Sequence, residues 1–168
     1  MNIKFCSVIP RENENVPILI SSKETIHYQK NEFIIIDFHG NYNIYELRYE
    51  YKCSPFKKAV IEGNLLAVGH EMYFHLFDVK KNLNVLTMEI SGYFSHLYYY
   101  DNIFYVAGAY GVYAINKGGK LLWSNECLAI DGVLINDFCQ NYIRGIGELD
   151  PPGGWEEFIL DRKTGMKK

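Results

Sequence analysis

The groups best suited to proton transfer or metal binding are the five histidines, His27, His39, His70, His75 and His96. None of them lies in an H-E-x-x-H or related ligand spacing, and the four cysteines form no C-x-x-C pair. His70 stands beside Glu71 in an expected turn, where a solvated histidine is favoured over a general base. The sequence therefore predicts neither a metal site nor a cofactor.

Nucleophilic and phosphate chemistry have no better support. The chain has no G-x-S-x-G elbow, which a serine hydrolase of the α/β class would need. The glycine pairs at 118–119 and 153–154 fall between expected strands, whereas a phosphate-binding loop opens a helix. Asp37, Asp101 and Asp161 are scattered rather than paired. We expect a protein that is not an enzyme.

Composition and charge restrict the partner and the compartment. Hydrophobic residues make up 48% of the 168, and the aromatic share of 15% favours strands. A net charge of −3 without a basic block disfavours nucleic-acid binding, which depends on lysine and arginine. There is no apolar run of about 20 residues to span a membrane. The first ten residues lack the apolar stretch of an export signal, so a cytoplasmic protein with reduced thiols is expected.

Internal repetition organises the chain. Residues 63–78 align without a gap on residues 101–116, because Asn64 falls on Asn102 and 102 − 64 = 38. A third copy begins at residues 141–147 with an offset of 39 and continues through 155–165. A fainter copy occupies residues 31–47. Each copy is preceded by a short apolar segment, and these lie at 25–28, 58–61, 96–100 and 133–135.

Four short strands per copy, with turns about every ten residues, predict an all-β fold. Segments such as Ile103-Phe-Tyr-Val-Ala are apolar at successive positions, which indicates strands covered on both faces. We therefore expect one domain over residues 1–168, built as a small β-propeller-like array of about four antiparallel meander blades. A curved β-sandwich or an incomplete propeller is the alternative.

One unit also resembles a known repeat. Residues 111–123, Gly-Val-Tyr-Ala-Ile-Asn-Lys-Gly-Gly-Lys-Leu-Leu-Trp, are similar to the PQQ-like (quinoprotein-type) β-propeller repeat. Residues 159–165 match the same turn, and residues 77–81 are a degenerate form of it. The resemblance implies the repeat architecture alone. Quinoprotein dehydrogenases are much longer, exported, and carry calcium-binding carboxylates, so no quinone cofactor is expected here.

In a meander blade, the loop between the second and third strands always emerges on the same face. Here those loops are residues 38–41, 69–71, 108–110 and 148–155, the last enlarged by Pro-Pro-Gly-Gly. Aromatic anchors among acidic side chains suit protein binding, although Trp155 could instead pack on its own blade. The side chains expected to be exposed there, and to bind a partner, are His39, His70, Glu71, Tyr110, Glu148, Asp150, Trp155 and Glu156.

The sequence leaves three functional interpretations. The preferred one is a non-catalytic protein-binding module: a small acidic chain of this kind resembles bacterial immunity proteins, which neutralise a cognate toxin, often a basic nuclease. The second is a binder of small molecules, or a lyase-like enzyme, that uses His70, Glu71 and His96 in the central funnel. The third is a scaffold unit of a larger assembly.

Overall fold

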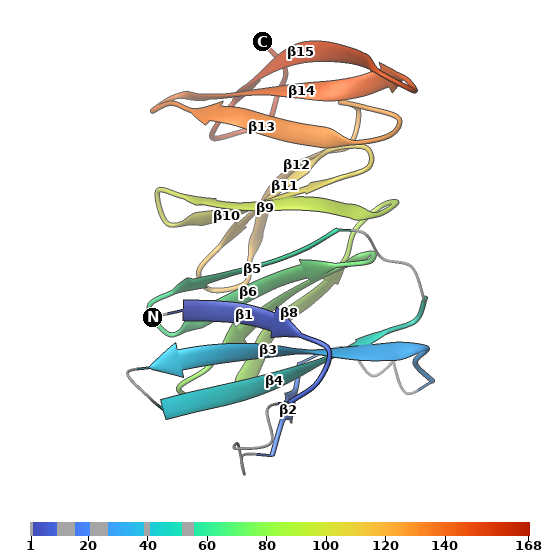
Figure 1. Cartoon of the computed structure of the whole chain (residues 1–168). Helices are drawn as coiled ribbons and strands as arrows, with labels where there is room; N and C mark the ends of the chain where they lie inside the picture. The colour runs from blue at the N-terminus through green and yellow to red at the C-terminus, as the bar shows by residue number, and fades with distance from the viewer. Residues whose placement is uncertain (1, 10–15, 21–26, 39–40, 52–55) are drawn as a thin grey trace. The chain divides into compact units, whose positions relative to one another are not determined.

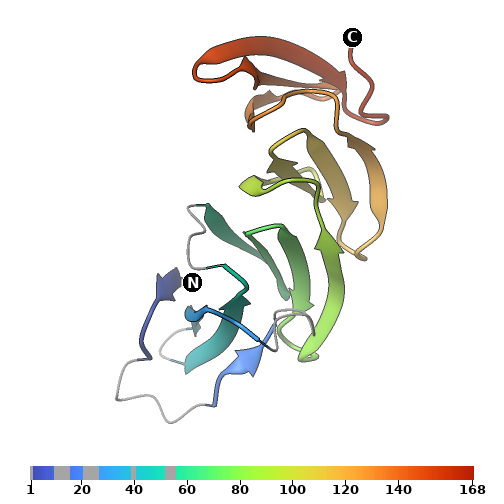
Figure 2. The ribbon, with the colours of Figure 1, turned by 90° about the vertical axis from the view of Figure 1, so that its right-hand side faces the viewer.

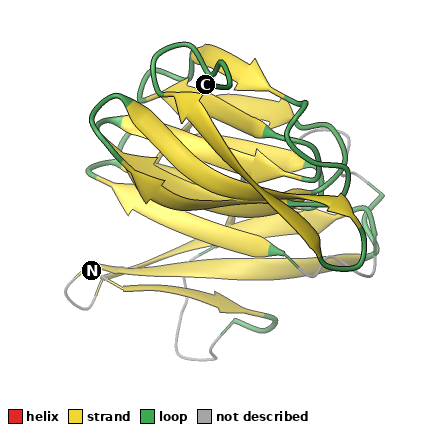
Figure 3. Cartoon of the chain, turned by 90° about the horizontal axis from the view of Figure 1, so that it is seen from above, coloured by secondary structure: helices red, strands yellow, loops and turns green. Residues whose placement is uncertain are grey.

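The computed structural model describes residues 2–9, 16–20, 27–38, 41–51 and 56–168, and these residues form strands and turns without any helix (Figure 3). Consequently, no helix in the described part of the chain is long and apolar enough to cross a membrane. Two compact units are present, residues 1–55 and residues 56–168. The all-β, propeller-like class expected from the sequence is confirmed.

The first unit is a four-stranded sheet of order β1-β3-β4-β2 (Figure 1). Its strands are β1 (Asn2–Cys6), β2 (Ile18–Leu19), β3 (Lys30–Phe38) and β4 (Asn41–Tyr49). The hairpin expected from the fainter repeat copy at residues 31–47 is present as β3 and β4. The expected lead-in segment, residues 25–28, lies partly outside the described residues; Tyr28 is in no strand, and β1 pairs with β3. β2 runs parallel to β4, so this sheet is not a simple meander.

The second unit consists of three meander sheets that follow one another along the chain (Figure 2). The first contains β5 (Lys57–Glu62), β6 (Leu65–His70), β7 (Tyr73–Asp78) and β8 (Leu83–Glu89). The second contains β9 (Phe94–Tyr100), β10 (Ile103–Gly108), β11 (Val112–Asn116) and β12 (Leu121–Asn125). The third contains β13 (Val133–Phe138), β14 (Tyr142–Asp150) and β15 (Gly154–Asp161).

The repeat offset is visible in the contacts between these sheets. Tyr93 Oη donates to Asp131 Oδ1 at 3.0 Å, and Ser95 Oγ donates to the Val133 carbonyl at 3.0 Å. In both pairs the partners are 38 residues apart in the chain. Equivalent positions at the starts of β9 and β13 therefore lie against each other, as they would in adjacent blades.

Strand β10 of the second sheet is buried on both faces, as its continuous apolar sequence predicts. Phe104 and Val106 belong to the core cluster that includes Phe74 and Leu76 of the first sheet. The intervening side chains of β10, Tyr105 and Ala107, belong to the cluster that includes the third sheet. Alternate residues of one strand thus enter two cores.

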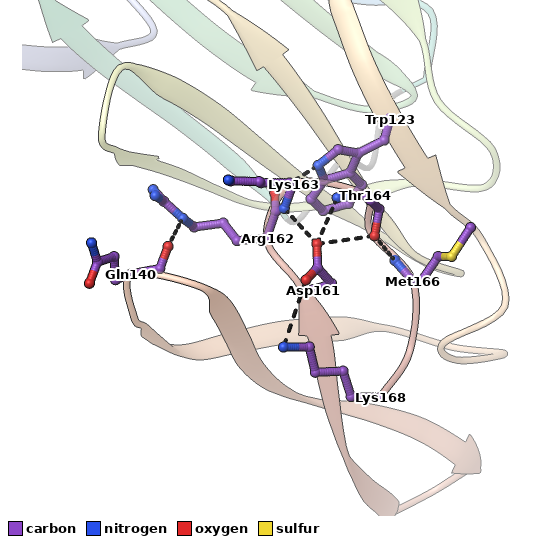
Figure 4. A network of polar contacts seen from close by, with 8 residues as sticks. All are labelled: Trp123, Gln140, Asp161, Arg162, Lys163, Thr164, Met166 and Lys168. Carbon is purple, nitrogen blue, oxygen red and sulfur yellow. Dashed lines mark hydrogen bonds and ion pairs between the residues drawn. The ribbon is translucent and has the colours of Figure 1, made fainter.

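In each of the three meander sheets, an Asx turn follows the third strand at the equivalent position. The side-chain oxygens of Asp78 and Asn116 each accept two backbone N–H groups from the residues that follow. Asp161 Oδ1 does the same with the N–H groups of Lys163 and Thr164 (Figure 4). These are the turns that the alignment of the repeats placed at equivalent positions. An aspartate or asparagine there substitutes for backbone partners that a tight reversal lacks.

The outward face of the third sheet departs from the repeat. Tyr105 on β10 corresponds to Arg144 on β14, and both Arg144 and its neighbour Glu157 are exposed. By the same pairing, Glu157 stands where the second sheet has the buried Val112. Charged residues therefore stand at two positions of the third sheet where the second sheet has the buried Tyr105 and Val112.

Candidate functional site

The loops between second and third strands lie along one edge of the second unit, as expected. Backbone hydrogen bonds join this edge from sheet to sheet: Phe94 N–H donates to the Glu71 carbonyl at the β6–β7 turn. Gly132 N–H donates to the carbonyl of Ala109 at 2.7 Å, in the β10–β11 loop, and Glu148 N–H donates to the Gly132 carbonyl at 3.0 Å. We call this edge the rim. His39, from the corresponding loop of the first unit, lies outside the described residues.

A cavity of about 320 Å³ opens at the rim. Two of the residues predicted from the sequence, Glu148 and Trp155, line it. Trp155 belongs to β15 and keeps 41% of its surface exposed. The complete lining is Phe56, Tyr93, Ser95, His96, Asp131, Gly132, Val133, Leu134, Glu148 and Trp155.

Three lining residues that the sequence did not single out form one wall. The rings of Phe56 and Tyr93 stack, with centroids 5.6 Å apart and planes inclined by 18°. Tyr93 is fixed further by its hydrogen bonds to the backbone and side-chain oxygens of Asp131. Tyr93 and Asp131 precede β9 and β13 with a spacing of 38, so the repeat offset was the signal that could have paired them.

The cavity wall carries negative potential. The pKa of Tyr93 is raised to about 12, first because the phenol is partly removed from water, and then by its hydrogen bond to Asp131 and the nearby charges of Asp131 and Glu148. Each of these effects disfavours a phenolate. The same field favours a positively charged ligand in the cavity.

His96 is the histidine that reaches this cavity. Its Nε2 lies 2.8 Å from Nζ of Lys58, 38 residues earlier on β5. Since an ammonium group can only donate, Nε2 is the acceptor and the imidazole is neutral. Its pKa is lowered accordingly, first by burial and then by the Lys58 charge.

His70 and Glu71 are not exposed, and the expectation that they would be is wrong. His70 is completely buried and Glu71 is 6% exposed. The segment leading into β9 covers their turn, with Ile90 N–H donating to the Met72 carbonyl at 2.8 Å. Neither residue lines the cavity, whereas His96 does.

His70 instead belongs to a buried pair. Its Nε2 lies 3.2 Å from Nε2 of His75, and the two rings stack with centroids 5.2 Å apart. His75 Nδ1 also contacts Thr87 Oγ1 at 3.0 Å. Among the residues that the structure describes, no three histidine, cysteine or acidic side chains are grouped so as to hold a metal ion.

The buried pair predicts a pH dependence of stability. The pKa of His70 lies well below 6.5, first because of its burial and then because of His75. The unfolded chain therefore takes up a proton near pH 6.5 that the folded chain refuses, so stability is complete above that pH and falls below it. Urea midpoints measured between pH 8 and pH 5 should decrease below about pH 6.5, and His70→Gln should flatten the curve. An unchanged curve for that variant would show that other groups cause the loss.

The remaining predicted residues are exposed but lie beside the cavity. Tyr110 is 40% exposed, and its carbonyl accepts the N–H groups of Leu128 and Ala129 in the linker to β13. Asp150 is the last residue of β14 and Glu156 lies on β15, and both are exposed. The rim thus combines two exposed aromatic rings with carboxylates around one cavity.

No protein-family model matches the chain, and neither does any curated protein sequence. Solved structures that are similar to it include the following two. The computationally designed Ika4 protein shares 16% identity at a TM-score of 0.53, over 66% of this chain and 68% of that one. The WD40 domain of Neurospora crassa Pan2 shares 11% identity at a TM-score of 0.52, over 81% of this chain and 45% of that one. At these identities the similarity concerns the fold alone, and the chain matches less than half of the Pan2 domain.

Proposed function

We propose that this chain is a non-catalytic protein-binding module whose rim docks a basic protein domain. The observation that carries the proposal is the exposed Trp155 at an acidic cavity. An exposed tryptophan gives a large contact area for little loss of conformational freedom. The surrounding carboxylates would attract a positively charged partner over a distance.

The specific role we propose is that of a bacterial immunity protein, which would bind and neutralise a cognate toxin, possibly a nuclease. A basic nuclease surface complements this rim in charge. We also propose that the repeats are of the quinoprotein type. The Asx turns at Asp78, Asn116 and Asp161 support that relationship, because they fall where that repeat places its Asp-containing turn.

Capture of the product of an adjacent toxin gene tests this function. We expect a one-to-one complex with the wild type and, for Trp155→Ala, an affinity lower by about tenfold or more, since a central aromatic anchor contributes over 1 kcal/mol. Leu121→Ala is the matched control, because Leu121 is similarly exposed, at 43%, but lies on β12 away from the cavity. Equal losses in both variants, or no complex with any neighbour-encoded protein, would contradict the proposal.

Binding of a small molecule is a second candidate function. Ser95 and His96 supply hydroxyl and imidazole groups inside a cavity of suitable size for a metabolite. A ligand that occupies it should raise the melting temperature of the wild type but not of a variant with the cavity filled from the exposed lining residue Leu134, such as Leu134→Trp.

A further inference from the structure

Aromatic rings enter the cavity from two sides. The stacked Phe56 and Tyr93 form one side, and Trp155 forms another. Between them lies Gly132, where an added Cβ would be 3.3 Å from Tyr93 Oη and 3.6 Å from Trp155 Cη2. Gly132 also has a φ of +127°, which side chains rarely adopt. A glycine at this position keeps the space between the two rings open.

The carboxylates that line the cavity are not balanced by any basic lining residue. Asp131 and Glu148 contribute carboxylates, and none of the ten lining residues is lysine or arginine. Lys58 contacts the lining residue His96, and its ammonium group is directed to Nε2 of that imidazole. Glu148 is held by the N–H of Gly153, which donates to its Oε1. The carboxylates are therefore fixed in place beside the aromatic walls.

We propose that this cavity is a binding site for a quaternary alkylammonium group. The faces of tryptophan, tyrosine and phenylalanine attract cations, and such rings with nearby carboxylates suit methylated ammonium groups. Methylation removes the N–H donors and most of the hydration, so the ligand loses little on entering walls formed by Val133, Leu134 and Trp155. This inference rests on the proposed docking function for the location of the site, and adds the chemistry of the group that enters it.

A pair of probes of equal shape isolates the charge. Choline and its uncharged isostere 3,3-dimethylbutan-1-ol are titrated into the full chain and followed by calorimetry and by the fluorescence of tryptophan. We expect saturable binding of choline and at least about tenfold weaker binding of the alcohol, since cation–π attraction in a desolvated site exceeds 1 kcal/mol. Equal binding of both, or binding of neither, overturns the proposal.

Variants locate the bound cation. Trp155→Leu removes one aromatic wall and should weaken choline binding by about tenfold, whereas Trp155→Phe should retain most of it. Glu148→Gln removes a charge but keeps an acceptor for Gly153, and its matched control is Asp150→Asn on the same loop, outside the lining. Retained urea midpoints establish that each variant folds. Choline binding that survives both Trp155→Leu and Glu148→Gln excludes this cavity as the site.

A last comparison distinguishes two possible carriers of the quaternary ammonium group. A free small molecule and a methylated lysine side chain share the same head group. A peptide with trimethyl-lysine that binds more tightly than choline, and more tightly than its unmodified counterpart, assigns the site to a protein ligand. Choline binding without any peptide preference assigns it to a small molecule. If choline binds but no toxin is captured, the ammonium site is supported and the immunity role is contradicted. If a toxin is captured but choline does not bind, the immunity role is supported and the ammonium site is contradicted.

Discussion

Replacing Phe104 by alanine lowers the free energy of unfolding of the second unit by about 3–5 kcal/mol. Phe104 is completely buried between the first and second sheets, with its ring centroid 4.9 Å from that of Tyr99 and 6.5 Å from that of Phe74. Alanine leaves a cavity that these rings cannot fill without shifting both sheets. A loss of this size is a large part of the stability of an ordinary domain.

Urea denaturation followed by tryptophan fluorescence measures this effect. Both tryptophans of the chain, Trp123 and Trp155, lie in the second unit, so the signal reports on that unit. Leu121→Ala is the control, because half-exposed Leu121 contributes little to the core and should change stability by less than about 1 kcal/mol. A similar small loss for Phe104→Ala would mean that the first and second sheets are not held together by this core.

Replacing Gly147 by alanine should cost about 2–4 kcal/mol. A Cβ at Gly147 would lie 2.1 Å from the carbonyl oxygen of Leu128, in the linker between the second and third sheets. The linker is backbone, and it is tied down by bonds from Leu128 and Ala129 to the Tyr110 carbonyl, so it cannot give way as a side chain would. Gly108, the equivalent residue of the second sheet, meets the Tyr93 carbonyl in the same manner at 3.0 Å.

The matched control for this substitution is Gly118→Ala. Gly118 has no positive φ, and its added Cβ would meet only the flexible side chain of Asn116 at 3.4 Å. It should therefore change the urea midpoint little. If Gly147→Ala is equally mild, the linker is free to move away from β14, and the rim is less rigid than its backbone bonds imply.

The sequence predicted most of the second unit because its repeats are nearly ungapped. β6 and β10 begin at Leu65 and Ile103, which are 103 − 65 = 38 residues apart, the same offset as in the alignment. The first unit was predicted only in its hairpin. Its remaining pairings join β1 to β3 and β2 to β4 across long separations, and no local pattern of residues encodes such contacts.

The cavity was predicted in part, for a related reason. Trp155 and Glu148 belong to a loop whose position follows from the meander, so strand order alone placed them at the rim. Phe56, Tyr93 and Asp131 enter the cavity from segments that precede the first strands, whose paths the repeat pattern does not specify. The same segments bury Glu71, which a meander without linkers would leave exposed.

The charges on the last sheet have a consequence for how such an array could grow. Arg144 and Glu157 occupy positions where the second sheet has the apolar Tyr105 and Val112. A duplicated unit appended after β15 would have to bury both charges against its own side chains, at a cost that apolar packing would not recover. Both charges therefore disfavour apolar packing against this face, whether by a further unit or by a second molecule.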